Sequence, residues 1–348
     1  MPSDNENKNS LLDKGGFQQP IEVSGYKKEF LLDILERMIL IRLVEEKLAD
    51  SKQKGLIGGP VHLAAGQEAI AVGIAENLTA DDKAFGTHRS HAQLLAIKPS
   101  FYELFAEILG KETGLSKGMG GSMHLHLNQQ DCAYFASVPI VSGTIAIAVG
   151  AAFHSKISKR GIGVAFFGDG AVEEGIFHES LNLSKILETP MLFVVENNLF
   201  ASHMHISQRQ PENFTARFAE ANNIGYEIID GNNILDVYNR SKKLIDQCRK
   251  GDGPKLIELI TYRHYGHVDW RKDIDVGVSR SEEDIIEWEK RDPITRLYDG
   301  MRKEELISDN EFNLITSELS DDINKAWDRA LNDDFPNKDA LMKRVFKA

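Results

Sequence analysis

The sequence predicts an α/β protein built on a doubly wound, mostly parallel sheet. The main observation is that short apolar runs of strand length alternate with stretches of helix length, at residues 162–168, 191–195, 226–230 and 255–260. Runs that are apolar throughout are typical of strands buried on both faces, and their alternation with helices favours parallel βαβ units. Ligands in such sheets bind at the carboxyl ends of the strands.

Length and composition agree with this class. The chain has 348 residues, of which 42% are hydrophobic and 27% charged, enough to bury one large core. Because no linker-like segment divides it, we expect a polar N-terminal tail over residues 1–28 and a single domain over residues 29–348, with a helical C-terminal part.

Three segments carry helix signals. Apolar residues recur at helical spacing from Phe30 to Leu48, which predicts an amphipathic helix. The apolar stretch from Val138 to Phe153 is interrupted by polar and small residues and is shorter than the roughly 18 residues of a membrane span, so we expect a buried helix. Residues 281–348 are charged and helix-prone, with a break at residues 292–294.

Charge and cysteine content argue against several classes of protein. Lys plus Arg number 41 and Asp plus Glu number 53, and the resulting net charge of −12 argues against a general polyanion binder. Any bound phosphate must therefore sit in a local site. Cys132 and Cys248 cannot form a disulfide framework, and the N-terminus lacks the basic and apolar regions of a signal peptide, so we expect a cytoplasmic protein.

The most informative motif lies at the ends of two expected strands. The first delivers Gly168, Asp169 and Gly170, and the second delivers Asn197 and Asn198. A right-handed crossover places these strands parallel and near each other, so Asp169 and Asn198 should converge at one sheet edge. Carboxylate and amide oxygens suit Mg²⁺, and flanking glycines followed by a helix N-terminus suit a diphosphate. The sequence therefore predicts a metal-diphosphate site.

A dinucleotide-binding turn is the rival interpretation of the same segment. It requires the spacing GxGxxG, whereas here the third glycine comes only at Gly175 and an acidic residue occupies the turn. A nicotinamide cofactor is disfavoured.

Histidines offer a second kind of metal site. All 11 lie between His62 and His267, and several form closely spaced pairs, namely His88 with His91, His124 with His126, His203 with His205, and His264 with His267. Zinc is disfavoured because no HExxH motif accompanies them. We expect His126, His154 and His178 to be ordinary surface or core residues.

At this point the chain resembles a known family. The GDG and NN motifs, HLAAGQEA at 62–69, THRSHA at 87–92, KGMGGSMH at 117–124 and GPKLIELITYRHYGH at 253–267 are similar to those of the α subunit of the E1 component of thiamine diphosphate-dependent 2-oxo acid dehydrogenases, of the pyruvate and acetoin type. The resemblance covers roughly residues 30 to 300 and implies the thiamine diphosphate-binding fold.

The resemblance implies roles for individual residues. Asp169 and Asn198 would ligate Mg²⁺ by side chain and Phe200 by its carbonyl, and His267 would reach the diphosphate from a loop and assist the second half-reaction. The other implied cofactor contacts are Gly168, Gly170 and Ala171 by backbone, Arg89 by charge, His88 where many relatives have tyrosine, and Phe135. His62 and His91 are further catalytic candidates in the active-site wall.

The sequence also departs from the family. Ala133 and Phe135 stand where a glycine and a small apolar residue are expected, residues 199–211 lack the usual aromatic-Gly-x-Ser pattern, and Val268 stands where regulated relatives carry a serine. These differences bear on the cofactor's pose and on the substrate or acceptor.

The resemblance implies an enzyme subunit that decarboxylates a 2-oxo acid such as pyruvate, or cleaves acetoin, and passes the acyl group to a lipoyl carrier. It also implies a β subunit in an α₂β₂ heterotetramer that supplies a glutamate to the cofactor, with a lipoyl-bearing acyltransferase as a further partner. Two alternatives stay open. One is a transketolase-like or carboligase subunit that transfers a two-carbon unit to an aldehyde or ketone; the other is a non-catalytic scaffold.

Overall fold

The centre of the molecule is a parallel six-stranded sheet in the order β2-β1-β3-β4-β8-β7. This computed structural model describes residues 8–13, 15–127, 133–274 and 280–340. The strands are β1 Lys83–Gly86, β2 Tyr134–Ser137, β3 Gly163–Gly168, β4 Met191–Asn197, β7 Gly225–Asp230 and β8 Lys255–Ile260, and a separate hairpin pairs β5 Phe200–Ala201 with β6 Met204–His205. The predicted class, a doubly wound parallel α/β sheet, is confirmed.

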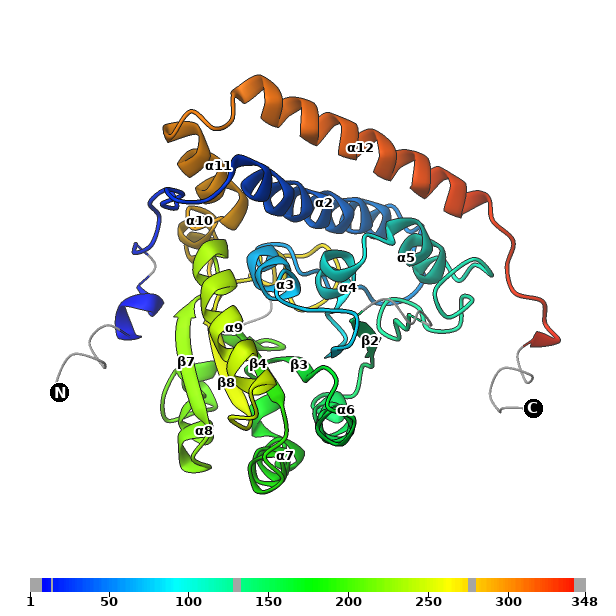
Figure 1. The fold of residues 1–348 in the computed structure, drawn as a ribbon. Coiled ribbons are helices and arrows are strands. Elements are labelled where there is room, and N and C mark those ends of the chain that lie inside the picture. Colours follow the sequence, from blue (N-terminus) through cyan, green and yellow to red (C-terminus); the bar gives the residue numbers. More distant parts are fainter. Residues whose placement is uncertain (1–7, 14, 128–132, 275–279, 341–348) are drawn as a thin grey trace.

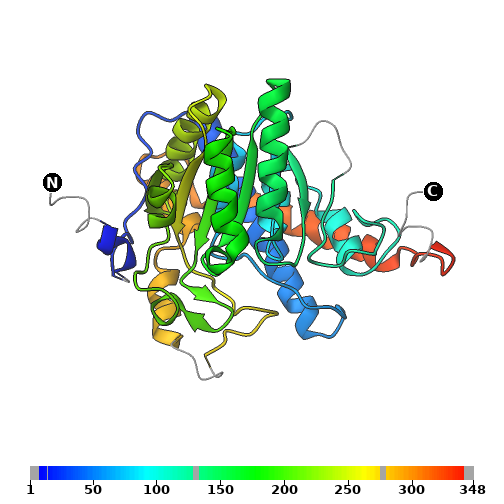
Figure 2. The ribbon, with the colours of Figure 1, turned by 90° about the horizontal axis from the view of Figure 1, so that it is seen from below.

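Helices cover both faces of this sheet (Figure 1, Figure 2). The α-helices are α2 Lys28–Gln53, α3 Glu68–Ala75, α4 His91–Ile97, α5 Phe101–Ile108, α6 Gly143–Ser158, α7 Gly175–Ile186, α8 Arg217–Ala221, α9 Ile234–Arg249, α10 Glu282–Glu289, α11 Pro293–Lys303 and α12 Asp309–Asn332. Three short 3₁₀ helices are η1 Ser10–Leu12, η2 Ala171–Glu173 and η3 Ile206–Gln208.

Alternation along the central strands explains why both faces are covered. In β3, Val164 and Phe166 pack with residues of α3 and α9, whereas Ala165 and Phe167 pack with residues of α6 and α7. Side chains of successive strand residues point to opposite faces, so a run that is apolar throughout requires a helix layer on each side.

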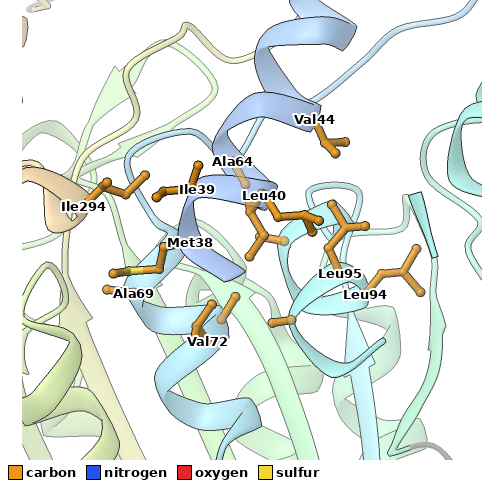
Figure 3. Packing of buried hydrophobic residues seen from close by; sticks show 14 of the residues in the cluster. Met38, Ile39, Leu40, Val44, Ala64, Ala69, Val72, Leu94, Leu95 and Ile294 are labelled. Carbon is orange, nitrogen blue, oxygen red and sulfur yellow. The ribbon is translucent and has the colours of Figure 1, made fainter. Parts of the chain in front are cut away.

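A third layer lies outside α3. Helix α2 packs across α3 and α4, and α12 lies over α2 and α5 (Figure 1). Figure 3 shows this core, with Met38, Ile39, Leu40 and Val44 of α2 against Ala69, Val72, Leu94 and Leu95. The expected amphipathic helix from Phe30 is confirmed, and the expected C-terminal helices are α10, α11 and α12, with the break at residues 292–294 falling where α11 begins.

The prediction of a buried helix over Val138–Phe153 is wrong in two respects, namely the bounds of the helix and the burial of its outer side. Helix α6 begins only at Gly143, and its outer side chains Ile147, Phe153 and Ile157 are exposed. The run is apolar on both sides of the helix, so its composition could not show that only one side meets the sheet. Among the described residues, no helix is long and apolar enough to cross a membrane.

The N-terminal segment contacts the body of the molecule in its described part. Ile21 and Val23 are buried, and the amide of Ile21 donates to the carbonyl of Arg296 at 2.9 Å. The division into a polar tail (1–28) and one domain (29–348) remains a prediction. Cys248 is buried and its thiol lies 3.4 Å from the Met191 carbonyl, whereas Cys132 lies outside the described residues.

Candidate active site

A pocket of about 270 Å³ opens at the carboxyl ends of β3 and β4. The two strands pair in register, with Gly168 opposite Glu196, so the segments that follow them emerge together at one sheet edge. The expected convergence of Asp169 and Asn198 is therefore confirmed. The pocket is lined by Thr87, His88, Arg89, Val141, Gly168, Asp169, Gly170, Ala171, Glu196, Asn198, Phe200, Ala201, Ser202 and His267.

Asp169 presents one engaged and one free carboxylate oxygen. Its Oδ2 accepts a hydrogen bond from the guanidinium of Arg209, while Oδ1 is buried without a hydrogen-bond partner within the described chain. Burial raises the pKa of Asp169, and the cation of Arg209 opposes that shift. A buried carboxylate oxygen without a donor is a suitable ligand for a hard cation.

Asn198 and Phe200 lie beside this carboxylate. The Asn198 amide donates to Oε1 of Gln67 at 2.9 Å, and its Oδ1 accepts from the Phe200 amide at 3.3 Å. Both residues are largely buried, and both line the pocket with Asp169. Gln67, which fixes the orientation of the Asn198 amide, was missed by the sequence analysis although it belongs to the HLAAGQEA motif.

The turn after β3 is narrow. A Cβ added at Gly170 would lie 2.5 Å from the Cβ of Ala201, so the hairpin approaches the turn as closely as glycine permits. The expected helix N-terminus does not follow directly, because η2 intervenes and α7 begins only at Gly175. Two acidic residues precede α7, and one of them, Glu173, pairs with Arg209.

Three buried arginines lie at or near the pocket: Arg89 lines it, and Arg263 and Arg280 carry N–H groups without a partner in the described part of the chain. Arg89 lines it and donates to the carbonyls of Leu63 at 2.6 Å and His267 at 2.9 Å, and burial lowers its pKa to about 10. Arg263 and Arg280 each have Nε and Nη1 without a partner among the described residues. Burial and then the neighbouring Arg89 and Arg280 lower the pKa of Arg263. Buried cations with unpaired N–H groups favour binding of an anion.

Sequence reasoning did not find Arg263 or Arg280. Arg263 lies in the TYRHYGH segment that follows β8, but nothing in that segment distinguishes its charge from that of a surface arginine. Arg280 donates to the Arg263 carbonyl at 2.6 Å, a contact that depends on the fold of the whole loop.

His62, His88 and His267 form a cluster at the pocket wall. Their ring centroids lie 4.6 Å (His62 to His88), 5.1 Å (His62 to His267) and 5.6 Å (His88 to His267) apart. Burial, followed by the positive charge of Arg89, lowers the pKa of His62 to about 2 and those of His88 and His267 to about 3. The three rings are therefore neutral at physiological pH.

His91 lies apart from this cluster. It is fully buried and does not line the pocket; Nδ1 contacts Oε2 of Glu45 at 3.1 Å and Nε2 contacts Oγ of Ser122 at 2.9 Å. With both ring nitrogens engaged, the contacts fit a positioning role for the loop that carries Ser122. A catalytic role for His91 remains a prediction.

The glycine-rich loop before Ser122 is held by one carboxylate. Oε2 of Glu107, at the end of α5, accepts from the amides of Ser116 at 2.6 Å and Gly118 at 3.0 Å. Its Oε1 accepts from the amides of Gly120 at 2.6 Å and Gly121 at 3.2 Å. The loop therefore has a fixed shape set by backbone donors, which explains its glycine content.

Two other residues of the pocket region are placed by the structure. Glu196 is buried, its Oε1 accepts from the Gln93 amide at 2.6 Å, and burial raises its pKa to about 8. Phe135 lies against the ring of Phe85 at 5.1 Å, is 43% exposed and is absent from the pocket wall, so its cofactor contact remains a prediction.

Comparison with known proteins agrees with the fold and the motifs. Residues 36–339 match the family described as Dehydrogenase E1 component. The chain is 34% identical over 321 residues to the α subunit of acetoin:2,6-dichlorophenolindophenol oxidoreductase of Bacillus subtilis. The aligned region covers 92% of this chain and 94% of that protein. It is also 34% identical over 329 residues to the pyruvate dehydrogenase E1 component subunit α of Porphyra purpurea, covering 92% and 93%. This chain belongs to the dehydrogenase E1 component family.

Proposed function

We propose that this chain is the α subunit of a thiamine diphosphate- and Mg²⁺-dependent E1 enzyme that decarboxylates a 2-oxo acid such as pyruvate, or cleaves acetoin, and passes the acyl group to a lipoyl carrier. The observation that carries the proposal is the buried Asp169, which has one carboxylate oxygen without a partner among the described residues and lines a pocket together with Asn198 and the buried cation Arg89. Family membership supports the same function.

The residues present fit a metal-bound diphosphate. Asp169 and Asn198 would ligate Mg²⁺ by side chain and Phe200 by its carbonyl, and all three lie at the pocket. Gly168, Gly170 and Ala171 would bind the diphosphate by backbone, and Arg89 would balance its charge. Arg263, which sequence reasoning missed, adds a buried cation close to Asp169.

The bound cofactor supplies a carbon nucleophile and an electron sink for cleavage of a carbon–carbon bond. The protein's part is to position groups and move protons. His267 and His88 are neutral and line the pocket, so each ring can donate a hydrogen bond from one nitrogen and accept a hydrogen bond at the other. Arg89 fixes the His267 backbone through its carbonyl, which holds that ring at the pocket.

A β subunit is the partner that this proposal requires. The resemblance implies that a glutamate of the β subunit activates the cofactor, and that the two subunits form an α₂β₂ heterotetramer. An apolar surface of α6 and α7 supports such a partner, with Ile147, Phe153 and Ile157 on one helix and Leu183 and Ile186 on the other all exposed. Helices α6 and α7 are neighbours, and large exposed apolar side chains on neighbouring helices favour an interface with a partner.

One observation supports the alternative function, a carboligase, as a second candidate. The hairpin after Asn198 departs from the family pattern and brings Arg209 into contact with Asp169. Arg209 places a positive charge directly against a carboxylate that lines the pocket.

The test is to purify the chain with the product of the neighbouring open reading frame and assay the pair. Thiamine diphosphate, Mg²⁺, pyruvate or acetoin and an artificial electron acceptor should together reduce the dye only when both chains are present. Cofactor binding without dye reduction would favour carboligation, and an aldehyde acceptor screen would follow. Absence of Mg²⁺-dependent cofactor binding by the pair would contradict both enzyme functions.

A further inference from the structure

The two asparagines at the end of β4 have different surroundings. Asn198 lines the pocket, whereas Asn197 is fully buried and does not line it. The side-chain amide of Asn197 donates to Oε1 of Glu258 at 2.7 Å and to the carbonyl of Asn213 at 3.0 Å. Its Oδ1 accepts from the backbone amide of Leu199 at 3.1 Å. The donors and the oxygen of Asn197 are therefore engaged within the protein, and Asn198 is the one that can serve a ligand.

Glu258 is a fully buried carboxylate with N–H donors on both oxygens. Its Oε1 also accepts from the backbone amide of Thr215 at 2.9 Å, and its Oε2 accepts from the amides of Thr215 at 2.9 Å and Ala216 at 2.8 Å. Burial raises the pKa of Glu258, and the hydrogen bonds from Thr215 and Asn197 oppose that shift. Because Glu258 lies on β8 and Ala216 directly precedes α8, this carboxylate ties the end of β4 to two further elements.

The turn that follows Asn197 has a conformation that needs such support. Leu199 takes a positive φ of 69°, in the left-handed region that a leucine rarely adopts and that persists where the surroundings fix it. Its amide bonds to Asn197, and its carbonyl accepts from the amide of Ile206 at 2.8 Å. The two residues on either side of it, Asn198 and Phe200, are the proposed Mg²⁺ ligands of this turn, and both line the pocket.

We propose that Glu258 is a positioning residue for the turn 198–200. It fixes the Asn197 amide, and Asn197 in turn holds Leu199 in the conformation that brings both flanking residues to the pocket. The inference rests on the proposed function, because it takes this turn to bind Mg²⁺. Glu258 does not line the pocket, so it acts on the metal only through the turn.

The donors around residue 258 require a carboxylate. Two backbone amides and the Asn197 amide all direct N–H groups at Glu258. A glutamine of the same shape offers one oxygen and one NH₂ group, so at least one N–H donor would face another donor. The backbone amides cannot turn away without moving α8, whereas the side-chain amide of Asn197 can rotate. Glu258→Gln should therefore release Asn197 and loosen the turn.

The first measurement is hydrogen exchange of the full-length, cofactor-free chain, with mass spectrometry of peptides that cover residues 197–201. Glu258→Gln should exchange about tenfold faster there than wild type, as loss of one hydrogen bond predicts. Asn197→Ala should do the same, and because it leaves Glu258 its backbone donors, it guards against a folding defect in the first variant. Glu227→Gln, on the neighbouring strand β7, removes a carboxylate that pairs with Lys243 and should leave exchange unchanged.

The second measurement is the Mg²⁺ dependence of thiamine diphosphate binding by the purified pair of subunits. Glu258→Gln and Asn197→Ala should each need about 10- to 100-fold more Mg²⁺ for half-saturation, the usual cost of losing a group that orients a metal ligand. At saturating Mg²⁺ both should regain the wild-type affinity for thiamine diphosphate, because no diphosphate contact has changed. A residue with a merely structural role would lower thermal stability without moving the half-saturating Mg²⁺ concentration.

Three results would overturn the inference. They are unchanged exchange over residues 197–201 in Glu258→Gln, an effect of Glu258→Gln that Asn197→Ala does not share, and faster exchange with an unchanged requirement for Mg²⁺. If the wild-type pair shows no Mg²⁺-dependent binding, the proposed function fails, and the exchange result still decides whether Glu258 holds the turn.

Discussion

Arg209 and Asp169 form an ion pair at the pocket in which both side chains are nearly inaccessible, at 6% and 1% exposure. Arg209 is also tied to Glu173 and, through Nε, to the carbonyl of Met204 at 3.1 Å. A cation of the protein therefore already neutralises the carboxylate that is expected to ligate Mg²⁺. Binding of the metal must share or replace this contact.

Replacing Arg209 by Gln should destabilise the cofactor-free chain and increase the stabilisation that Mg²⁺ and thiamine diphosphate confer. Removing one partner of a buried pair leaves an uncompensated charge and costs about 3 kcal/mol, which a bound cation would restore. Thermal unfolding with and without cofactor measures both effects. Arg217→Gln, in the helix that follows the same loop, serves as the control. A cofactor-induced shift smaller than that of wild type would contradict this prediction.

Asp169→Asn should abolish Mg²⁺-dependent binding of thiamine diphosphate, because an amide of the same shape lacks the charge that a hard dication requires. Isothermal calorimetry at fixed Mg²⁺ should show at least about a 100-fold loss of affinity. Glu174→Gln removes an exposed carboxylate from the same turn and should bind as wild type does. Unchanged affinity in Asp169→Asn would refute the site assignment.

The histidine cluster should make the fold sensitive to acid. Its three pKa values, at about 2, 3 and 3, lie below the ordinary value of 6.5, so below that pH the unfolded chain binds protons that the folded chain does not. The stability they contribute is therefore present above pH 6.5 and is lost as the pH falls toward 3. Each residue accounts for at most about 1.4 kcal/mol per pH unit.

Urea unfolding of His88→Tyr between pH 7 and pH 5 tests this linkage. The variant should lose less stability over that range than wild type, because one of the three titrating groups is gone. Thr87→Ser, which changes a neighbouring pocket residue that does not titrate, should keep the wild-type slope. An identical slope in wild type and His88→Tyr would exclude the assigned contribution.

Glu107→Gln should loosen the glycine-rich loop. An amide side chain accepts with only one oxygen, so about half of the four charge-assisted backbone bonds are lost, at a cost of about 3 kcal/mol. Hydrogen exchange at residues 116–121 should accelerate. Glu103→Gln in the same helix makes none of these bonds and should leave exchange unchanged. Protection that persists in Glu107→Gln would show that the loop holds its shape by other means.

The sequence predicted the part of the site that follows from local rules. Asp169 and Asn198 meet because two strands joined by one helix lie side by side, and a strand–helix–strand pattern can be recognised in a sequence. The pairing of Arg209 with Asp169 depends on the path of a hairpin in which Leu199 takes a positive φ of 69°, which no periodicity reports. Arg263 and Arg280 differ from surface arginines only in being buried, and burial cannot be read from the sequence around them.

The same limits apply to the fold. The four apolar runs became strands, but β1 and β2 were missed because each has only four residues, too few to show a period. The exposed side of α6 was missed because an apolar composition looks the same whether a helix is buried by its own chain or by a partner.

The strand order has a consequence for how the chain is made. β8 lies between β4 and β7 although it is the last strand in the sequence, and β7 pairs with no strand but β8 in the described sheet (Figure 1). During synthesis the edge of β4 therefore stays open, and β7 unpaired, until residue 260 has left the ribosome. Arg263 and His267 follow within seven residues of that point. Closing the sheet and completing the pocket are consequently one late event, and a nascent chain stalled earlier exposes a strand edge while its pocket still lacks Arg263 and His267.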